Sequence, residues 1–264
     1  MAQITAAMVK ALRDETGQGM MECKKALIEA DGDVEAAQDI LRKKGLALAD
    51  KRAGRETSEG LIAIKAADDG AGAAMVEVSC ETDFCARNDV FRTMVASIAE
   101  TALAEDAGPI EATGAMVDAV QDALAKIGEN MGYVRGIKIA APKVGTYLHH
   151  NSKVGVMIGY EGDLDPETLS GVCMHIAFAD PMGITVDDVP AELVEKERVF
   201  ATQQAIDSGK PPEIAEKIVE GKMRKFLSGK ALLEQPYVRD DKKKVRDVLG
   251  SATVTAFARF AVGG

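Results

Sequence analysis

A strand followed by a helix occurs twice in this sequence, with Val76 of the first copy matched by Val154 of the second. Alternating apolar residues predict the strand, and apolar residues three or four positions apart predict the helix. Because a small sheet must cover its apolar face, the repeat predicts two related α+β subdomains, each an antiparallel sheet with helices packed on it. The matched positions are Val76 and Val154, Val78 and Val156, Phe91 and Leu169, Val95 and Cys173, and Ile98 and Ile176.

Each subdomain is expected to contain further strands with the same alternation. An early strand precedes the repeat, and a late strand follows a short helix. The early strands are 61–65 and 146–148, the short helices are 116–127 and 245–249, and the late strands are 134–140 and 255–262.

The first part of the chain has helical periodicity only. Apolar residues predict helices over 4–12, 20–30 and 34–45, separated by Gly-rich turns, with Asp33 as the N-cap of the third helix. A basic, Ala- and Gly-rich segment then gives a helical tail and a linker. The expected organisation is a three-helix module at 1–52, a linker at 53–59, a first subdomain at 60–141 and a second at 142–264.

A helical hairpin interrupts the second subdomain within 189–228. Residues 191–208 and 213–227 flank the breaker Gly209-Lys210-Pro211-Pro212, and their apolar stripes can face each other. The pattern allows either a protruding coiled-coil arm or a hairpin packed into the core. The expected stripes are Leu193, Val194, Phe200 and Ala201 on one helix and Ala215, Ile218, Val219 and Phe226 on the other.

Composition excludes several classes of protein. A net charge of -10 and an aromatic content of 4% without Trp argue against a direct nucleic-acid ligand. No apolar run approaches ~18 residues and no secretory signal is present, so we expect a cytoplasmic protein without a membrane partner. The 4 cysteines form no CxxC pair and the chain has 3 histidines. We therefore expect reduced thiols, no metal site and no cofactor.

Motifs for nucleotide binding and covalent catalysis are also missing. Glu22 stands where a dinucleotide fingerprint after Gly17 needs its third glycine, and the Gly-Lys pairs lack the upstream glycine of a phosphate-binding loop. No spacing links a cysteine to a histidine, and His175 lies among apolar residues typical of a core. An enzyme with a thiol nucleophile is therefore the weakest hypothesis.

Two short segments carry large apolar residues beside turns. Phe84 follows Asp83 in a strand-to-helix loop, where it either tucks under its own helix, with Asp83 or Asn88 as a simple cap, or remains exposed for a partner. Met20 and Met21 follow a Gly-rich turn, and adjacent residues of a helix cannot both face one core. One methionine is therefore expected to be exposed as an adaptable contact.

Two long motifs, 12–27 and 77–87, closely resemble the signatures of the elongation factor Ts family. The likeness covers nearly the whole chain. It also includes 126–130, 147–149, 208–217 and 235–238.

This resemblance implies a guanine-nucleotide exchange factor that binds elongation factor Tu in its GDP-bound and nucleotide-free forms, without chemical conversion of a substrate. The three-helix module, similar to ubiquitin-associated domains, would dock on the partner's nucleotide domain. A loop in the first subdomain would dislodge the partner's Mg²⁺, with Phe84 as a wedge. The second subdomain would grip the partner's C-terminal domains, and the hairpin would form a homodimer. The implied contacts are Leu12, Arg13, Met20 and Met21 in the module, Thr82, Asp83, Phe84 and Cys85 in the loop, and His149 in the second subdomain.

The chain departs from the family pattern at Ser79, where Asn is usual, and at Cys85, where Val is usual. Both changes are modest in size, so we expect altered packing of the loop without loss of function. The chain stops at Gly264, where many members continue into another helix, so a lower affinity is expected. A second hypothesis, a binding module without exchange activity, remains open, and a preference for the nucleotide-free partner distinguishes the two.

Overall fold

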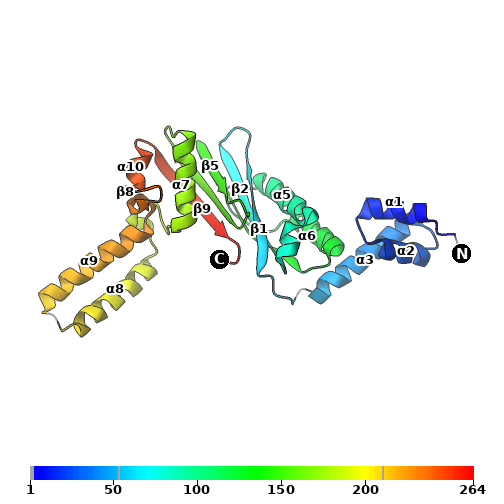
Figure 1. Ribbon diagram of the computed structural model, residues 1–264, viewed down its shortest axis with the longest axis horizontal. Coiled ribbons are helices and arrows are strands. Elements are labelled where there is room, and N and C mark those ends of the chain that lie inside the picture. Colours follow the sequence, from blue (N-terminus) through cyan, green and yellow to red (C-terminus); the bar gives the residue numbers. More distant parts are fainter. Residues whose placement is uncertain (1–2, 53, 210) are drawn as a thin grey trace. The chain divides into compact units, whose positions relative to one another are not determined.

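The computed structural model describes residues 3–52, 54–209 and 211–264 of the chain (Figure 1). The chain forms two compact units, and neither is continuous in sequence. Unit 1 comprises Met1–Lys65, Ala74–Lys138 and Ala261–Gly264, and unit 2 comprises Ala66–Ala73 and Ile139–Phe260.

Unit 1 begins with the three-helix module: α1 (Ala6–Thr16), α2 (Met20–Glu29) and α3 (Val34–Arg52). The Thr5 hydroxyl caps α1, and Gly17 ends it with a φ of 68°, a conformation that favours glycine. Asp33 Oδ1 accepts the Ala36 N–H at 3.0 Å, which confirms the predicted cap of α3. The core of the module consists of Val9, Leu12, Cys23, Ala26, Leu27, Ala37 and Leu41.

Gly45 lies inside α3 and does not end it. A Cβ at this position would lie 2.8 Å from Cβ of Ala125, on α6 (Gly114–Ile127). Glycine therefore allows α3 and α6 to approach closely within unit 1. The expected helical tail after Gly45 is regular helix as far as Arg52.

The rest of unit 1 contains a four-stranded sheet in the order β1-β2-β4-β3. A core of apolar side chains joins β2 to the helices α5 and α6. The elements are β1 (Glu59–Ala66), β2 (Gly72–Cys80), α4 (Asp83–Arg87), α5 (Asp89–Leu103), β3 (Gly108–Ile110), α6 and β4 (Met131–Ala140).

Unit 2 contains the second copy of the repeat: a three-stranded sheet in the order β5-β6-β9, with α7 packed against β5 and β6 (Figure 1). Strands β5 and β6 are antiparallel, with Lys143 opposite Tyr160 and Leu148 opposite Gly155. The mixed fold with two related small sheets is thus confirmed. The elements are β5 (Lys143–Leu148), β6 (Val154–Glu161), α7 (Pro166–Ala179), α10 (Val245–Leu249) and β9 (Thr253–Ala261).

The inserted hairpin consists of α8 (Ala191–Asp207) and α9 (Pro212–Lys230), which lie side by side (Figure 1). Its seam is built from Ala201 and Ala205 on α8 and from Val219 and Met223 on α9. The prediction that Phe200 lies in this seam is wrong, since its side chain is 58% exposed. Two alanines four residues apart form one face of α8 and let α9 approach closely. Residue 210 of the predicted breaker lies outside the described residues.

Four further short elements lie in unit 2, near the hairpin in the sequence: η1 (Val186–Asp188), η2 (Leu232–Glu234), β7 (Pro236–Tyr237) and β8 (Asp240–Lys244). Both 3₁₀ helices contact α9. Strands β7 and β8 pair antiparallel as a two-stranded sheet. The sequence analysis did not predict these elements.

His175 of α7 is buried in unit 2, as the apolar pattern around it indicated. Its Nδ1 accepts the Val238 N–H at 3.2 Å, so Nε2 carries the proton and donates to Gln235 Oε1 at 2.9 Å. Burial lowers the pKa of His175 from its usual value, and the hydrogen bond to Gln235 opposes this shift. His175 is therefore a neutral structural residue that connects α7 to the segment before β8.

Candidate partner-binding site

Two methionines are exposed at the start of α2. Met20 is 55% exposed and Met21 is 61% exposed, whereas the sequence analysis expected one exposed methionine. The first buried residue of α2 is Cys23, so the first turn of this helix lies outside the core of the module. Both side chains are therefore available to a partner.

The structure places the other two implied contacts of the module differently. Arg13 is exposed on α1. Leu12 is fully buried in the core of the module, so its side chain cannot reach a partner, which corrects the expectation for this residue. Leu12 instead supports the packing of α1 against α2.

The loop after β2 presents Phe84 to solvent. The Thr82 hydroxyl caps α4 by accepting the Cys85 N–H at 3.2 Å, and Phe84 is 78% exposed. Asp83 is an ion-pair partner of Arg87, with 3.0 Å between Asp83 Oδ2 and Arg87 Nη2. The alternative in which Phe84 tucks under its own helix is therefore wrong.

Two residues of this loop have structural roles. Cys85 is 2% exposed and packs in the apolar core of unit 1, so its side chain does not face a partner. Asn88 caps α5 by accepting the Val90 N–H at 2.8 Å, whereas Asp83 makes no such cap. The exposed residues of the loop are thus Phe84, Arg87 and Asn88, with Asp83 half-buried.

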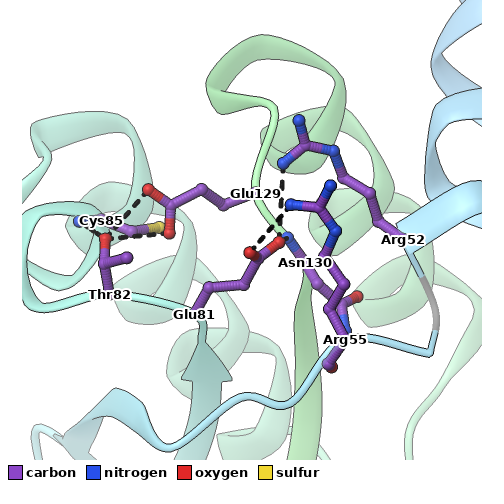
Figure 2. A network of polar contacts seen from close by, with 7 residues as sticks. All are labelled: Arg52, Arg55, Glu81, Thr82, Cys85, Glu129 and Asn130. Carbon is purple, nitrogen blue, oxygen red and sulfur yellow. Dashed lines mark hydrogen bonds and ion pairs between the residues drawn. The ribbon is translucent and has the colours of Figure 1, made fainter.

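A cluster of charged and polar side chains attaches the loop to neighbouring segments of unit 1 (Figure 2). Glu81 forms ion pairs with Arg52 at 3.5 Å and with Arg55 at 3.2 Å, and it accepts the backbone N–H of Asn130. The Asn130 N–H and the two guanidinium groups lower the pKa of Glu81. Asn130 also donates through Nδ2 to the Arg55 carbonyl at 2.7 Å. The end of α3 and the linker are therefore attached to the residue that precedes Thr82.

Thr82 is held by Glu129, which precedes Asn130 in the sequence. Its Oγ1 lies 2.9 and 3.0 Å from the two carboxylate oxygens of Glu129, and the side chains point toward each other in Figure 2. Glu129 follows Gly128, which ends α6 with a φ of 79°. The turn between α6 and β4 thus contacts both Glu81 and Thr82.

The two cysteines of the loop, Cys80 and Cys85, are buried free thiols, and Cys80 Sγ donates to the Thr82 carbonyl at 3.3 Å. The hydrogen bond to Cys85 and burial raise the pKa of the Cys80 thiol well above its usual value. A thiol that keeps its proton is a poor nucleophile. The same hydrogen bond lowers the pKa of the Cys85 thiol. Burial of both side chains, 0% exposed for Cys80 and 2% for Cys85, is what weighs against the hypothesis of a thiol enzyme.

Ser79, the first departure from the family pattern, belongs to the same region. Its Oγ donates to Thr57 Oγ1 at 2.9 Å, which ties the linker to β2. The other departure, Cys85, occupies a buried position where a small apolar side chain fits. Both changes therefore affect the packing behind the loop and leave its exposed residues intact.

His149 belongs to unit 2, directly after β5. Its Nδ1 lies 2.7 Å from the Tyr147 hydroxyl, and its ring lies 4.2 Å from that of His150, measured between centroids. The side chain is half-buried. A neighbour on each side thus fixes the imidazole at the end of the strand.

Within the described residues, no group of three or more His, Cys, Asp or Glu side chains could hold a metal ion. The helices of the described part of the chain are too short or too polar to cross a lipid bilayer.

Comparison with known proteins identifies the family. A family model described as elongation factor Ts matches residues 81–264. The chain belongs to the elongation factor Ts family. It is 43% identical to the elongation factor Ts of Alkalilimnicola ehrlichii, with 98% of this chain and 92% of that protein covered. It is 45% identical to the elongation factor Ts of Photorhabdus laumondii, over 100% of this chain and 93% of that protein, and 43% identical to that of Desulfovibrio desulfuricans, over 98% of each.

The residues behind the loop were not predicted from the sequence. Glu129 and Asn130 fell inside a family motif, 126–130, but were given no role. Glu81, Arg52 and Arg55 were equally unassigned. One signal was available: Gly128 at a helix end predicts a tight turn, and the polar residues that follow it must find partners.

Proposed function

We propose that this protein is a guanine-nucleotide exchange factor for elongation factor Tu in translation elongation. Membership of the elongation factor Ts family supports the class of activity. The observation that carries the mechanism is the exposure of Phe84, 78%, on a one-turn helix beside Asp83. A large apolar side chain held in water by a short, well-anchored element is suited to insertion into a partner.

The mechanism follows from the chemistry of a GTPase. GDP is held by a phosphate-binding loop and by Mg²⁺, which compensates the phosphate charge. Phe84 inserts between helices of the partner, while Asp83 acts beside it, and together they displace the groups that hold Mg²⁺. GDP then leaves faster. No bond is made or broken in a substrate, so the protein is not an enzyme, and rebinding follows the concentrations of GDP and GTP.

Other residues supply affinity. Met20, Met21 and Arg13 form the contact of the three-helix module, with Leu12 supporting them from within. His149 contributes a contact from unit 2 to the partner's C-terminal domains. The helical hairpin forms a homodimer. Neither a nucleic acid nor a membrane is a direct ligand. The protein acts in the cytoplasm.

The competing function is a binding module that recognises the same partner without promoting exchange. Such a module binds the GDP-bound and the nucleotide-free partner equally, whereas an exchange factor binds the nucleotide-free form more tightly. The exposed Phe84 favours exchange, because recognition alone gives no reason to hold a large apolar side chain on a separate loop.

Stopped-flow release of a fluorescent GDP analogue from elongation factor Tu tests the proposal. The wild-type protein accelerates release in a concentration-dependent manner. Phe84→Ala reduces the maximal rate about thirtyfold, because removing a phenyl ring that is buried in the complex costs about 2 kcal/mol. The matched control is Phe178→Ala, since Phe178 is 79% exposed but lies in unit 2. Equal rates for Phe84→Ala and the wild type would contradict the wedge role.

A further inference from the structure

Thr82 connects Glu129 to α4, the short helix that carries Phe84. Its hydroxyl oxygen accepts the Cys85 N–H at 3.2 Å, and its single proton faces the Glu129 carboxylate, 2.9 and 3.0 Å away. A hydroxyl has one proton to donate, so this pair of contacts fixes its rotation. The bond to Glu129 also has an ionised acceptor, which makes it stronger than a bond between neutral groups.

Helix α4 depends on this anchor because it is short. It has 5 residues, and of these Cys85 and Ala86 are buried. A single turn has little intrinsic stability, so its direction is set by its cap and its packing. Phe84 lies two positions after Thr82, and a change at the cap therefore changes where the ring points.

The preceding residue is anchored by the same turn. The Asn130 N–H donates to Glu81, and Arg52 and Arg55 pair with the same carboxylate. Glu81 thus keeps the loop attached even when the contact with Glu129 is removed. Because this second attachment remains, the role of Glu129 can be tested without unfolding the loop.

We propose that Glu129 is a positioning residue for nucleotide exchange: it holds the Thr82 hydroxyl and so sets the direction in which α4 presents Phe84. This inference rests on the proposed exchange function. Glu129 itself need not touch the partner or its nucleotide. Its effect passes through Phe84, and this distinguishes it from a residue that adds affinity directly.

Exchange kinetics with three variants test the role. Glu129→Ala removes the acceptor and lowers the maximal rate of GDP release about fivefold, the effect of one lost hydrogen bond, with a smaller change in the half-saturating concentration. Glu129→Gln keeps an oxygen acceptor of the same reach and restores the rate to within about twofold. Glu111→Ala, an exposed glutamate before α6, is the matched control and leaves the rate unchanged.

A double-mutant cycle separates positioning from other roles. In the Phe84→Ala background, Glu129→Ala causes no further loss, because the ring that it positions is gone. An equal loss in both backgrounds would show that Glu129 acts independently of Phe84 and would overturn the inference. So would a rate for Glu129→Ala equal to that of the wild type, or a failure of Glu129→Gln to restore it.

The same data distinguish the two levels of the account. If wild-type protein does not accelerate GDP release, the proposed function fails and the inference fails with it. If the wild type accelerates release and Phe84→Ala slows it, but Glu129→Ala has no effect, only the inference fails. Thermal unfolding of each variant, expected within a few degrees of the wild type, excludes loss of folded protein as the cause of a slower rate.

Discussion

Met20 and Met21 occupy the first turn of α2, where both side chains are more than half exposed. Flexible thioether side chains adapt to an apolar partner surface. We predict that Met21→Gln raises the half-saturating concentration for exchange about tenfold, because it removes an apolar contact that contributes about 1.4 kcal/mol to binding. The maximal rate changes little, since Phe84 is intact. Concentration series of GDP release measure both quantities.

Ile28 is the control for this prediction. Ile28 lies on the same helix as Met21, but at the opposite end of α2. Its side chain is 57% exposed, a fraction similar to that of Met21. Ile28→Gln is expected to leave both kinetic quantities unchanged. If the two variants behave alike, the contact is not specific to the start of α2, and the role of Met21 is rejected.

His175 gives unit 2 a dependence on pH. Its pKa is lowered by burial in the folded protein, so below about pH 6.5 the unfolded chain binds a proton that the folded chain does not. The stability contributed by neutral His175 is therefore present above this pH and is lost as the pH falls through the folded pKa.

Asparagine at position 175 removes this titration. His175→Asn is predicted to lose about 1–3 kcal/mol of stability at pH 7, from weakened hydrogen bonds to Gln235 and Val238. The difference in the free energy of unfolding between the variant and the wild type then becomes smaller toward pH 5. Urea unfolding at both pH values measures it, and a difference that stays constant would show that His175 does not titrate as described.

At the residue scale, the sequence predicted local features better than distant ones. The Asp33 cap follows from a turn and its neighbours, so one stretch of sequence contained the information. Leu12 was misplaced because a family motif does not separate a residue that touches a partner from one that supports it. Glu129 was missed because its partner, Thr82, is 47 positions away.

At the scale of elements, the helical hairpin offers an apolar surface outside its seam. Phe200 is 58% exposed and Ile206 is 63% exposed, both on α8. If the hairpin forms a homodimer, these side chains lie in the interface. We predict that Phe200→Glu converts a dimer into a monomer in sedimentation velocity, because an unpaired charge in an apolar interface is costly.

The control for this experiment is Ser170→Glu, which adds the same charge at an exposed position of α7, outside the hairpin. It should leave the dimer intact. A wild-type protein that sediments as a monomer at tens of micromolar would contradict the proposed dimer, and the exposed residues would then need another explanation.

Long periodic elements were predicted, whereas the shortest ones were not. The nineteen-residue helix α9 has an apolar stripe that repeats over several turns. Strand β7 has 2 residues and begins with a proline, and β3 has 3, so neither shows an alternation that could be read. Such strands form because a neighbouring strand is present, and that neighbour is a feature of the fold.

At the scale of the whole molecule, the sequence order does not reveal the two units. Residues 261–264 return to unit 1 after more than a hundred residues of unit 2. Buried Glu77 explains this return: it pairs with Arg135 at 2.7 Å and accepts the Gly263 N–H at 3.1 Å. A buried carboxylate needs such partners, but their identity depends on the folded chain.

Under the proposed function, the protein stabilises the nucleotide-free state of its partner, which is a statement about binding free energies. Thermodynamic linkage requires that the factor by which it weakens GDP binding equals the factor by which GDP weakens its own binding. Exchange and simple recognition therefore differ in one measurable ratio.

The most direct test is to measure the Kd of wild-type protein for elongation factor Tu in two states, nucleotide-free and saturated with GDP and Mg²⁺, by isothermal titration calorimetry. The account predicts binding to the nucleotide-free state that is tighter by about a hundredfold, or about 3 kcal/mol, with the preference reduced in Phe84→Ala. Equal affinities for the two states would contradict the account and would make the protein a binding module.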